Sequence, residues 1–378
     1  MKPKRSRQFR FRVMVLVAAV AFLPLLLEVD GSLAQQSGTN TFRLLTFEVG
    51  NSGSRLGTTR GDGEQDIVDV HNAVLYLTKT GASEVDGLAP IPIDMRSLIE
   101  AGDASVQSVK IVHDVISRVK ASGSFTEPGG SARVFHPPSG VRYLPPIPNP
   151  SKVFGGAGAY LRPNPDGTPG NYDKVEFPSF FLKPPSSLTG HDTDINLRGL
   201  LTRGVYEPEC AVIIKKRAKF VPQSEVMDYV FGFTNFNDVS SRDLPAGEHT
   251  SQGSNMSKGL DTFTPLGPYI TLAEDVPDPA NLEIVATVDG VRHEWPHKNG
   301  NTNFLTFSLE ESISYLSERM TLEPGDVVST GVPSPSMPFA AGETIEISIG
   351  NLGTLRNRVV SEPHPGWSPI QPRKAHQD

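Results

Sequence analysis

Two glutamates one residue apart, Glu207 and Glu209, stand at the entrance of an apolar run in the segment YEPECAVII (206–214). The run is typical of a buried β-strand, on which residues i and i+2 point to the same face. Two carboxylates held that closely repel each other, and burial strengthens the repulsion. A divalent cation removes both problems, and oxygen ligands without Cys or His favour Mg²⁺, Mn²⁺ or Ca²⁺. For such a pair taken alone, two solvated glutamates at a strand end are the simpler interpretation.

Other strand-like runs end in residues that would complete such a site. The segment TNFNDVSSRDL (234–244) contains Asp238 and Arg242, and SKGLDTFTPLGPYI (257–270) contains Lys258. Three carboxylates with a lysine and several hydroxyl groups at strand ends predict a site for a hard metal ion. The lysine would supply a positive charge for an anionic substrate.

The elements that must position these residues differ along the chain. Residues 41–50 are predicted to form a strand, and the i, i+3, i+4 spacing of apolar residues at 64–78 and 93–120 indicates helices. The second helical pattern is broken near Gly102. Together these elements predict a small N-terminal α+β domain over 40–133.

A Pro-rich stretch at 134–152 is incompatible with helix and is expected to be an extended linker. Beyond it, over 153–362, short apolar runs alternate with Gly, Pro, Asn and Asp, which is typical of strands. One helix is predicted at 308–320, where Ser308 and Glu311 have the spacing of a capping box. The predicted fold class is therefore α+β and β-dominated.

The two ends of the chain have different compositions from the rest. KPKRSRQFRFR carries six cations, an apolar run follows, and small residues stand at Ser32 and Ala34. This pattern predicts a signal peptide over 1–34, an exported (periplasmic or secreted) protein, and no stable membrane association after cleavage. An uncleaved membrane anchor is the alternative, although the apolar run is shorter than the ~20 residues of a membrane span. Residues 363–378 are expected to be a loose tail.

Composition narrows the classes of function. The formal net charge is −7 over 378 residues and no basic stripe follows the N-terminus, so nucleic acid is not an expected partner. Cys210 is the only cysteine, which excludes an internal disulfide and a zinc site built on cysteines. Its place at the start of an apolar run predicts a buried, unreactive thiol.

From about residue 144 to 360 the sequence resembles the catalytic domain of the fumarylacetoacetate hydrolase family. The segments that carry this resemblance, in family order, are LPPIPNPSKVFGGAGAY, FFLKPPSSLTG, VYEPECAVII, NDVSSRDL, SKGLDTFTPLGPYI, LEPGDVVSTGVP and GNLGTLRNRV. The resemblance implies a mixed-sheet β-roll and a Mg²⁺ or Mn²⁺ site formed by Glu207, Glu209 and Asp238. It also implies an enzyme that hydrolyses C–C bonds of β-diketo acids, or decarboxylates or tautomerises small oxo acids.

The resemblance carries over to further residues. Lys258 falls on the family's lysine, which implies a catalytic residue that also binds the substrate's oxygens. Tyr160, Arg242 and Thr262 match motif positions and are expected to bind the substrate, a small oxo acid. Family members commonly pair and exposed strand edges invite a partner, so a homodimer is expected.

The family's N-Y-x-x-H motif, whose His activates water together with a nearby Glu, is not kept. Tyr160 matches its Tyr, but Ala159 replaces the Asn and Pro163 stands in place of the His. The Gln of R-D-L-Q is Pro245, and the second Thr of T-G-T-P is Val332. The metal-binding residues are therefore present while the water-activating ones are missing.

Several residues could replace the missing His, although each is also compatible with an ordinary surface role: Asp166, Asp173, Glu176, His191 and His249. The segment GAGAYLRPNPDGTPGNY (156–172) is expected to be a loop rather than a helix. Lys183 either lines the cleft or packs in the core. Two functions stay open, a metal-dependent oxo-acid enzyme and an inactive exported relative that binds metal and small acids.

Overall fold

The computed structural model of the chain describes residues 41–61, 65–161, 164, 175–198, 204–242, 253–295, 298–333, 336–363 and 365–366. These residues all belong to one compact unit. The predicted signal peptide, nearly all of the predicted tail and most of the predicted loop at 156–172 lie outside them. Within the described ranges, no helix combines the length and the apolar character that crossing a membrane requires.

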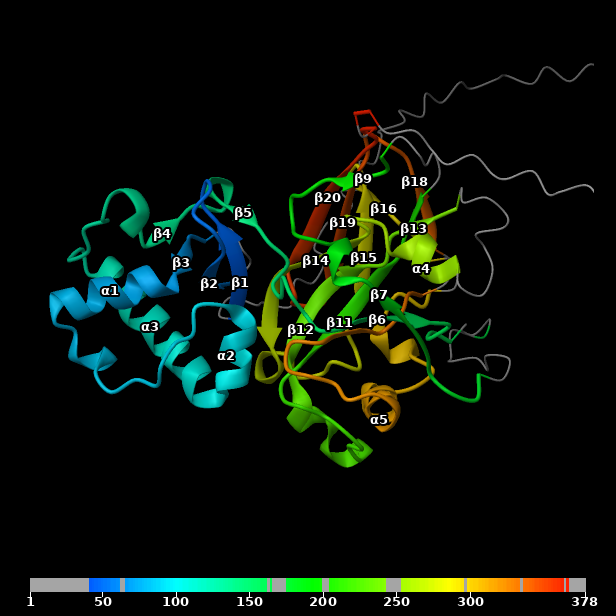
Figure 1. The fold of residues 1–378 in the computed structure, drawn as a ribbon, viewed down its shortest axis with the longest axis horizontal. Coiled ribbons are helices and arrows are strands. Elements are labelled where there is room, and N and C mark those ends of the chain that lie inside the picture. The colour runs from blue at the N-terminus through cyan, green and yellow to red at the C-terminus, as the bar shows by residue number, and fades with distance from the viewer. Residues whose placement is uncertain are drawn as a thin grey trace, which may run out of the picture. The chain divides into compact units, whose positions relative to one another are not determined.

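A mixed twelve-stranded sheet forms the centre of the structure (Figure 1). Its strand order is β4-β3-β2-β1-β14-β12-β11-β17-β6-β7, with β5 beside β1 and β8 beside β14. The pairs β17–β6 and β14–β8 are parallel and the others are antiparallel. The strands are β1 (Phe42–Glu48), β2 (Arg55–Arg60), β3 (Ile67–Asp69), β4 (Phe135–His136), β5 (Arg142–Tyr143), β6 (Val153–Ala157), β7 (Ser179–Lys183), β8 (Leu188–Thr189), β11 (Pro208–Ile214), β12 (Val230–Asn237), β14 (Thr264–Leu272) and β17 (Val327–Ser329).

Two smaller sheets complete the described β-structure. The three-stranded sheet has the order β13 (Ser240–Ser241), β10 (Gly204–Tyr206), β18 (Met337–Phe339). The five-stranded sheet has the order β16 (Val291–Arg292), β15 (Ile284–Val288), β19 (Thr344–Ile349), β20 (Thr354–Val360), β9 (Ile195–Asn196). Side chains of β19 and β20 alternate between buried and more exposed, as expected for strands with one face on a core.

The core lies on both faces of β11. Val212 and Ile214 belong to a cluster that includes α5 (Leu309–Arg319) and the five-stranded sheet, whereas Ala211 and Ile213 belong to a cluster that includes α2 (Met95–Ala101). Successive strand residues point to opposite faces. A strand buried on both faces therefore needs the continuous apolar run seen in the sequence.

The remaining α-helices in the described part of the chain are α1 (Val70–Thr80), α3 (Asp103–Ala121) and α4 (Gly253–Lys258). The predicted break at Gly102 is confirmed, because this glycine separates α2 from α3 with a positive φ of 83°. The capping box of α5 is also confirmed, since Ser308 and Glu311 exchange both expected hydrogen bonds. The β-dominated α+β fold class is likewise confirmed.

The helix predicted at 64–78 exists, but its predicted start is wrong. Ile67–Asp69 forms β3, which pairs with β2 and β4, and helix α1 begins only at Val70. The Asp69 carboxylate accepts the backbone N–H of Asn72 (3.1 Å) and so caps the helix. The stretch 134–152 is extended as predicted, apart from a short 3₁₀ turn at Pro138–Gly140.

The N-terminal elements are hydrogen-bonded into the large sheet. Strand β1 pairs with β14, and its buried Arg43 donates to the carbonyls of Gly61 and Asn351. The Arg43 guanidinium also lies over the Tyr269 ring, 5.4 Å from its centroid. These contacts cover the edge of β14 that would otherwise be unpaired.

A buried histidine of α3 packs against β2. The Nδ1 atom of His113 lies 2.8 Å from the Thr58 hydroxyl oxygen, and the edge of the ring faces Phe42. Burial, together with the nearby positive charge of Arg60, lowers the pKa of His113 from 6.5 to about 4. Between pH 6.5 and 4 the His113 side chain is therefore mostly protonated in the unfolded chain and mostly neutral in the folded chain.

We expect the neutral His113 side chain to make stability pH-dependent. Its contribution is full above pH 6.5 and is lost as the pH falls toward 4, by up to about 3 kcal/mol. A His113→Gln variant, which cannot titrate there, should lose correspondingly less stability over the same interval. Urea unfolding of both proteins at pH 7.5, 5.5 and 4.5 measures this difference, and parallel pH dependences would contradict the prediction.

Candidate active site

The antiparallel pairing of β11 and β12 brings the three predicted carboxylates together. Glu209 is the second residue of β11, Glu207 precedes that strand, and Asp238 follows β12. Pro208 lies opposite Asn237, and beyond it the Asp238 N–H donates to the Glu207 carbonyl (3.0 Å), so the pairing continues past the strand ends. One oxygen from each carboxylate lies within 4.8 Å of the other two.

All three carboxylates are withdrawn from solvent. Asp238 and Glu209 are 0% exposed and Glu207 is 7% exposed. The alternative of two solvated glutamates at a strand end is therefore wrong. Only Glu209 lies on a strand, so the expectation that both glutamates belong to one strand is also wrong, although their carboxylates do converge.

Two lysines compensate these negative charges. Lys258, the last residue of α4, donates from Nζ to Glu207 Oε2 (2.7 Å), Asp238 Oδ2 (2.6 Å) and Ser240 Oγ (2.6 Å). Lys183, the last residue of β7, is fully buried and donates to Asp238 Oδ1 and to the Phe263 carbonyl (3.0 Å). The sequence left Lys183 open between packing and the cleft. The sequence signal that could have assigned Lys183 to the site was a charged residue at the end of the apolar run SFFLK.

The three carboxylates differ in the direction in which their surroundings shift their pKa values. Burial, followed by the negative charges of Asp238 and Glu207, raises the pKa of Glu209 well above its ordinary value. Burial likewise raises the pKa of Glu207. Burial alone would also raise the pKa of Asp238, but Lys183 and Lys258 more than offset this and lower it. The site thus holds one carboxylate ionised and two that require a further positive charge.

The contacts of Glu209 fit a bound divalent cation. Ser329, the last residue of β17, donates to Glu209 Oε2, while the buried Oε1 has no hydrogen-bond partner. Buried polar atoms rarely lack a partner. Oxygens that share an ion at about 2.1 Å lie within about 4.2 Å of each other, so Glu207, Glu209 and Asp238 need little movement to hold Mg²⁺ or Mn²⁺. Their hard oxygen donors suit such an ion.

The predicted substrate-binding residues lie at different distances from the triad. Arg242 is 51% exposed, with Nη2 3.7 Å from Glu207 Oε1. Tyr160 is buried, and burial together with neighbouring groups that include Glu209 raises its pKa. The hydroxyl oxygen of Thr262 instead accepts the backbone N–H of Asn196 (2.9 Å). Contact of these three residues with substrate stays a prediction.

The candidates for the missing histidine gain no support from the described residues. Glu176 is exposed, and His191 Nδ1 accepts the backbone N–H of Arg356 (3.0 Å) while its ring packs on Tyr143. The other candidates lie outside the described residues: Asp166, Asp173 and His249. Pro163, Asp243 and Pro245 also lie outside them. The prediction for Cys210 is confirmed, since its thiol is buried and burial raises its pKa to about 12.

Comparison with known proteins gives consistent matches. Residues 160–360 match the fumarylacetoacetate (FAA) hydrolase C-terminal family. Oxaloacetate tautomerase YisK of Bacillus subtilis (strain 168) is 32% identical over 229 residues, which cover 58% of this chain and 74% of that protein. The structure of 2-hydroxyhepta-2,4-diene-1,7-dioate isomerase from Mycobacterium marinum is similar with a TM-score of 0.59 and 26% identity, over 85% of this chain and 99% of that one. The structure of maleylpyruvate hydrolase from Sphingobium sp. SYK-6, in complex with manganese(II) ion and pyruvate, is similar with a TM-score of 0.59 and 27% identity. The match covers 85% of this chain and 99% of that one.

We expect Mg²⁺ or Mn²⁺ to raise the melting temperature, because a cation relieves the repulsion among the three carboxylates. Metal at 100 times its Kd would add about 2.7 kcal/mol of stability. Glu209→Gln should abolish the rise, whereas Glu225→Gln, at an exposed position, should leave it intact. Since the pKa values of Glu207 and Glu209 are raised, protons compete with the metal, and the rise should be larger at pH 8 than at pH 6.

Thermal denaturation with metal or with EDTA measures these effects. Identical melting temperatures of the wild type under both conditions would remove the metal site. An undiminished rise in Glu209→Gln would show that the ion binds elsewhere.

Proposed function

The chain belongs to the fumarylacetoacetate hydrolase family, and on that basis we propose that it is a divalent-metal-dependent enzyme that tautomerises or decarboxylates a small oxo acid. The observation that carries this proposal is the buried triad Glu207, Glu209 and Asp238 with Lys258 beside it. The named relatives support it, because they include an oxaloacetate tautomerase, an isomerase and a maleylpyruvate hydrolase.

The triad and the lysines have separable tasks in such a reaction. A cation held by Glu207, Glu209 and Asp238 would polarise a substrate carbonyl and stabilise the negative charge of an enolate. Burial alone would lower the pKa of Lys258, but Asp238 and Glu207 raise it above its ordinary value. Lys258 therefore stays protonated and supplies positive charge to the substrate's oxygens. Lys183, buried against Asp238, keeps that carboxylate ionised.

The sequence favours these two reactions over hydrolysis. Pro163 stands where the family's water-activating His would be, and His191 is engaged by a backbone N–H and an aromatic ring. Tautomerisation moves a proton between carbon and oxygen, and decarboxylation releases CO₂ and leaves an enolate. Neither reaction needs an activated water as a nucleophile.

We expect Lys258→Met to lower turnover about 10²-fold or more, the scale reported for loss of one charge-stabilising group. His191→Ala, away from the triad, should change turnover by only a few fold. The assay follows the enol absorbance of oxaloacetate and of acylpyruvates with Mg²⁺ or Mn²⁺, against a protein-free control with the same metal. Pyruvate released from oxaloacetate indicates decarboxylation, pyruvate released from an acylpyruvate indicates hydrolysis, and a change in enol absorbance without pyruvate indicates tautomerisation.

Other outcomes of this assay have definite meanings. A loss of ~10²-fold in His191→Ala would identify a general base and favour hydrolysis. A silent Lys258→Met variant would contradict the role given to this lysine. If the wild type turns over none of these compounds, the inactive metal-binding relative becomes the better description.

Residues 1–34 support the further proposal that the protein is exported through a cleaved signal peptide. The pattern of basic residues, apolar run and small residues at Ser32 and Ala34 carries it. We expect mass spectrometry of the protein from its native host to give Gln35 as the mature N-terminus. Ala34→Trp should block cleavage, because the −1 position requires a small residue. Full-length wild-type protein recovered with the membrane fraction would favour the anchor instead.

A further inference from the structure

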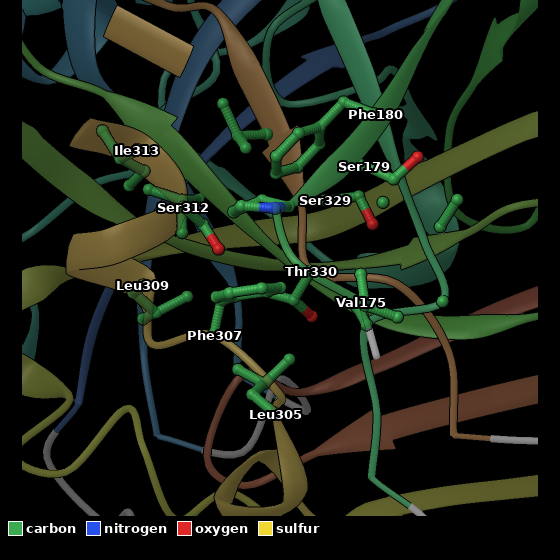
Figure 2. Close-up of a pocket in the computed structure, with 17 residues that line it drawn as sticks. Val175, Ser179, Phe180, Leu305, Phe307, Leu309, Ser312, Ile313, Ser329 and Thr330 are labelled. Atoms are coloured by element: carbon green, nitrogen blue, oxygen red, sulfur yellow. The ribbon is translucent and has the colours of Figure 1, made fainter. Parts of the chain in front are cut away.

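A cavity next to the triad is lined mainly by apolar side chains (Figure 2). Most come from β7, from α5 and from the segments before each of these elements, and others come from β6, β11 and β17. They include Val175, Phe180, Leu305, Phe307, Leu309 and Ile313. The polar side chains that line it all carry hydroxyl groups, and none of the described lining residues is charged.

The polar end of the cavity adjoins the carboxylates. Ser329 lines the cavity and also donates to Glu209 Oε2. Thr330, next along the chain, contributes a buried hydroxyl. Tyr160 follows the lining residue Ala159, and its buried hydroxyl lies beside that of Thr330. A molecule whose oxo-acid end is at the triad therefore meets hydroxyl groups first and apolar walls beyond them.

We propose, on the basis of the proposed function, that the substrate's far end is a short, uncharged, apolar group that occupies this cavity. A buried carboxylate without a cationic partner is strongly disfavoured. The free interior of about 20 Å³ admits one or two groups of the size of water or methyl. The substrate class is thus a 2-oxo monocarboxylic acid with a short alkyl end, rather than a dicarboxylic acid. Of the two proposed reactions, only tautomerisation applies to such an acid, because decarboxylation to an enolate needs a carboxylate β to the carbonyl.

This class differs from the substrates in the names of two relatives. Oxaloacetate and 2-hydroxyhepta-2,4-diene-1,7-dioate both carry a second carboxylate. Among the described residues, Arg242 places a guanidinium near the triad, but it lies beside Glu207 and Ser336 and does not line this cavity. The described lining of the cavity therefore disfavours a second negative charge at the substrate's far end.

The test compares two acids that share the oxo-acid end. Titration calorimetry of the full-length, Mn²⁺-loaded protein measures Kd for 2-oxopentanoate and for 2-oxoglutarate, which has a carboxylate in place of the methyl group. We expect 2-oxopentanoate to bind at least ~10-fold more tightly, because the carboxylate would be buried without a partner. Equal or tighter binding of 2-oxoglutarate, or no binding of either acid, would overturn the proposal.

Two variants test whether this cavity determines the preference for the length of the alkyl end. Phe307→Leu enlarges the cavity and should strengthen binding of 2-oxoheptanoate relative to 2-oxopentanoate, by about fourfold for each added methylene that becomes buried. Phe304→Leu is the same change at a partly buried position that does not line the cavity, and it should leave the ratio unchanged. Equal ratios in the two variants would overturn the assignment of the cavity.

Failure of this proposal and failure of the proposed function give different results. Tight binding of 2-oxopentanoate without turnover of any oxo acid would reject catalysis but keep the cavity assignment. Turnover without a preference for the alkyl end would keep catalysis and reject the assignment.

Discussion

The burial of three carboxylates on one hydrogen-bonded strand pair is the constraint on which the rest of the site depends. The β11–β12 pairing fixes the backbones of Glu207 and Asp238 against each other, so their side chains cannot separate to reduce repulsion. Away from water that repulsion is strong. The surrounding chain must therefore supply positive charge and hydrogen-bond donors close to these oxygens.

The sheet order determines where this compensation comes from. Strand β17 is the other neighbour of β11 and supplies Ser329 to Glu209. Strand β7, at the end of the same sheet, supplies Lys183, whose ammonium also binds the Phe263 carbonyl just before β14. Since β14 pairs with both β12 and β1, the N-terminal elements support the same strands that hold the carboxylates. The small N-terminal part thus contributes to the site by fixing its framework.

The features that could be predicted from sequence were local ones. Glu207, Glu209 and Asp238 stand at strand ends where charge is unexpected, and the capping box of α5 depends on two residues three positions apart. Ser329 could not be assigned, because its contact with Glu209 crosses between strands 120 residues apart. The start of α1 was placed too early because pairing of Ile67–Asp69 with β2 and β4 overrides the helical spacing. For both Ser329 and the start of α1, a contact between residues far apart in the sequence determined the structure, and the local pattern could not reveal it.

The residues of the charge network and the family's water-activating residues differ in how well the fold tolerates their substitution. Lys183, Lys258 and the three carboxylates form one largely buried unit, in which removal of either lysine leaves negative charge uncompensated and destabilises the fold. By contrast, the motif in which Pro163 replaces the His follows β6 in the sequence, in a segment predicted to be a loop, and loops generally tolerate substitution better than core strands. A chain with this architecture can therefore lack the family's water-activating His and still keep the three carboxylates and Lys258. A sequence that has Pro163 in place of the His and keeps Glu207, Glu209 and Asp238 is the result expected from that difference.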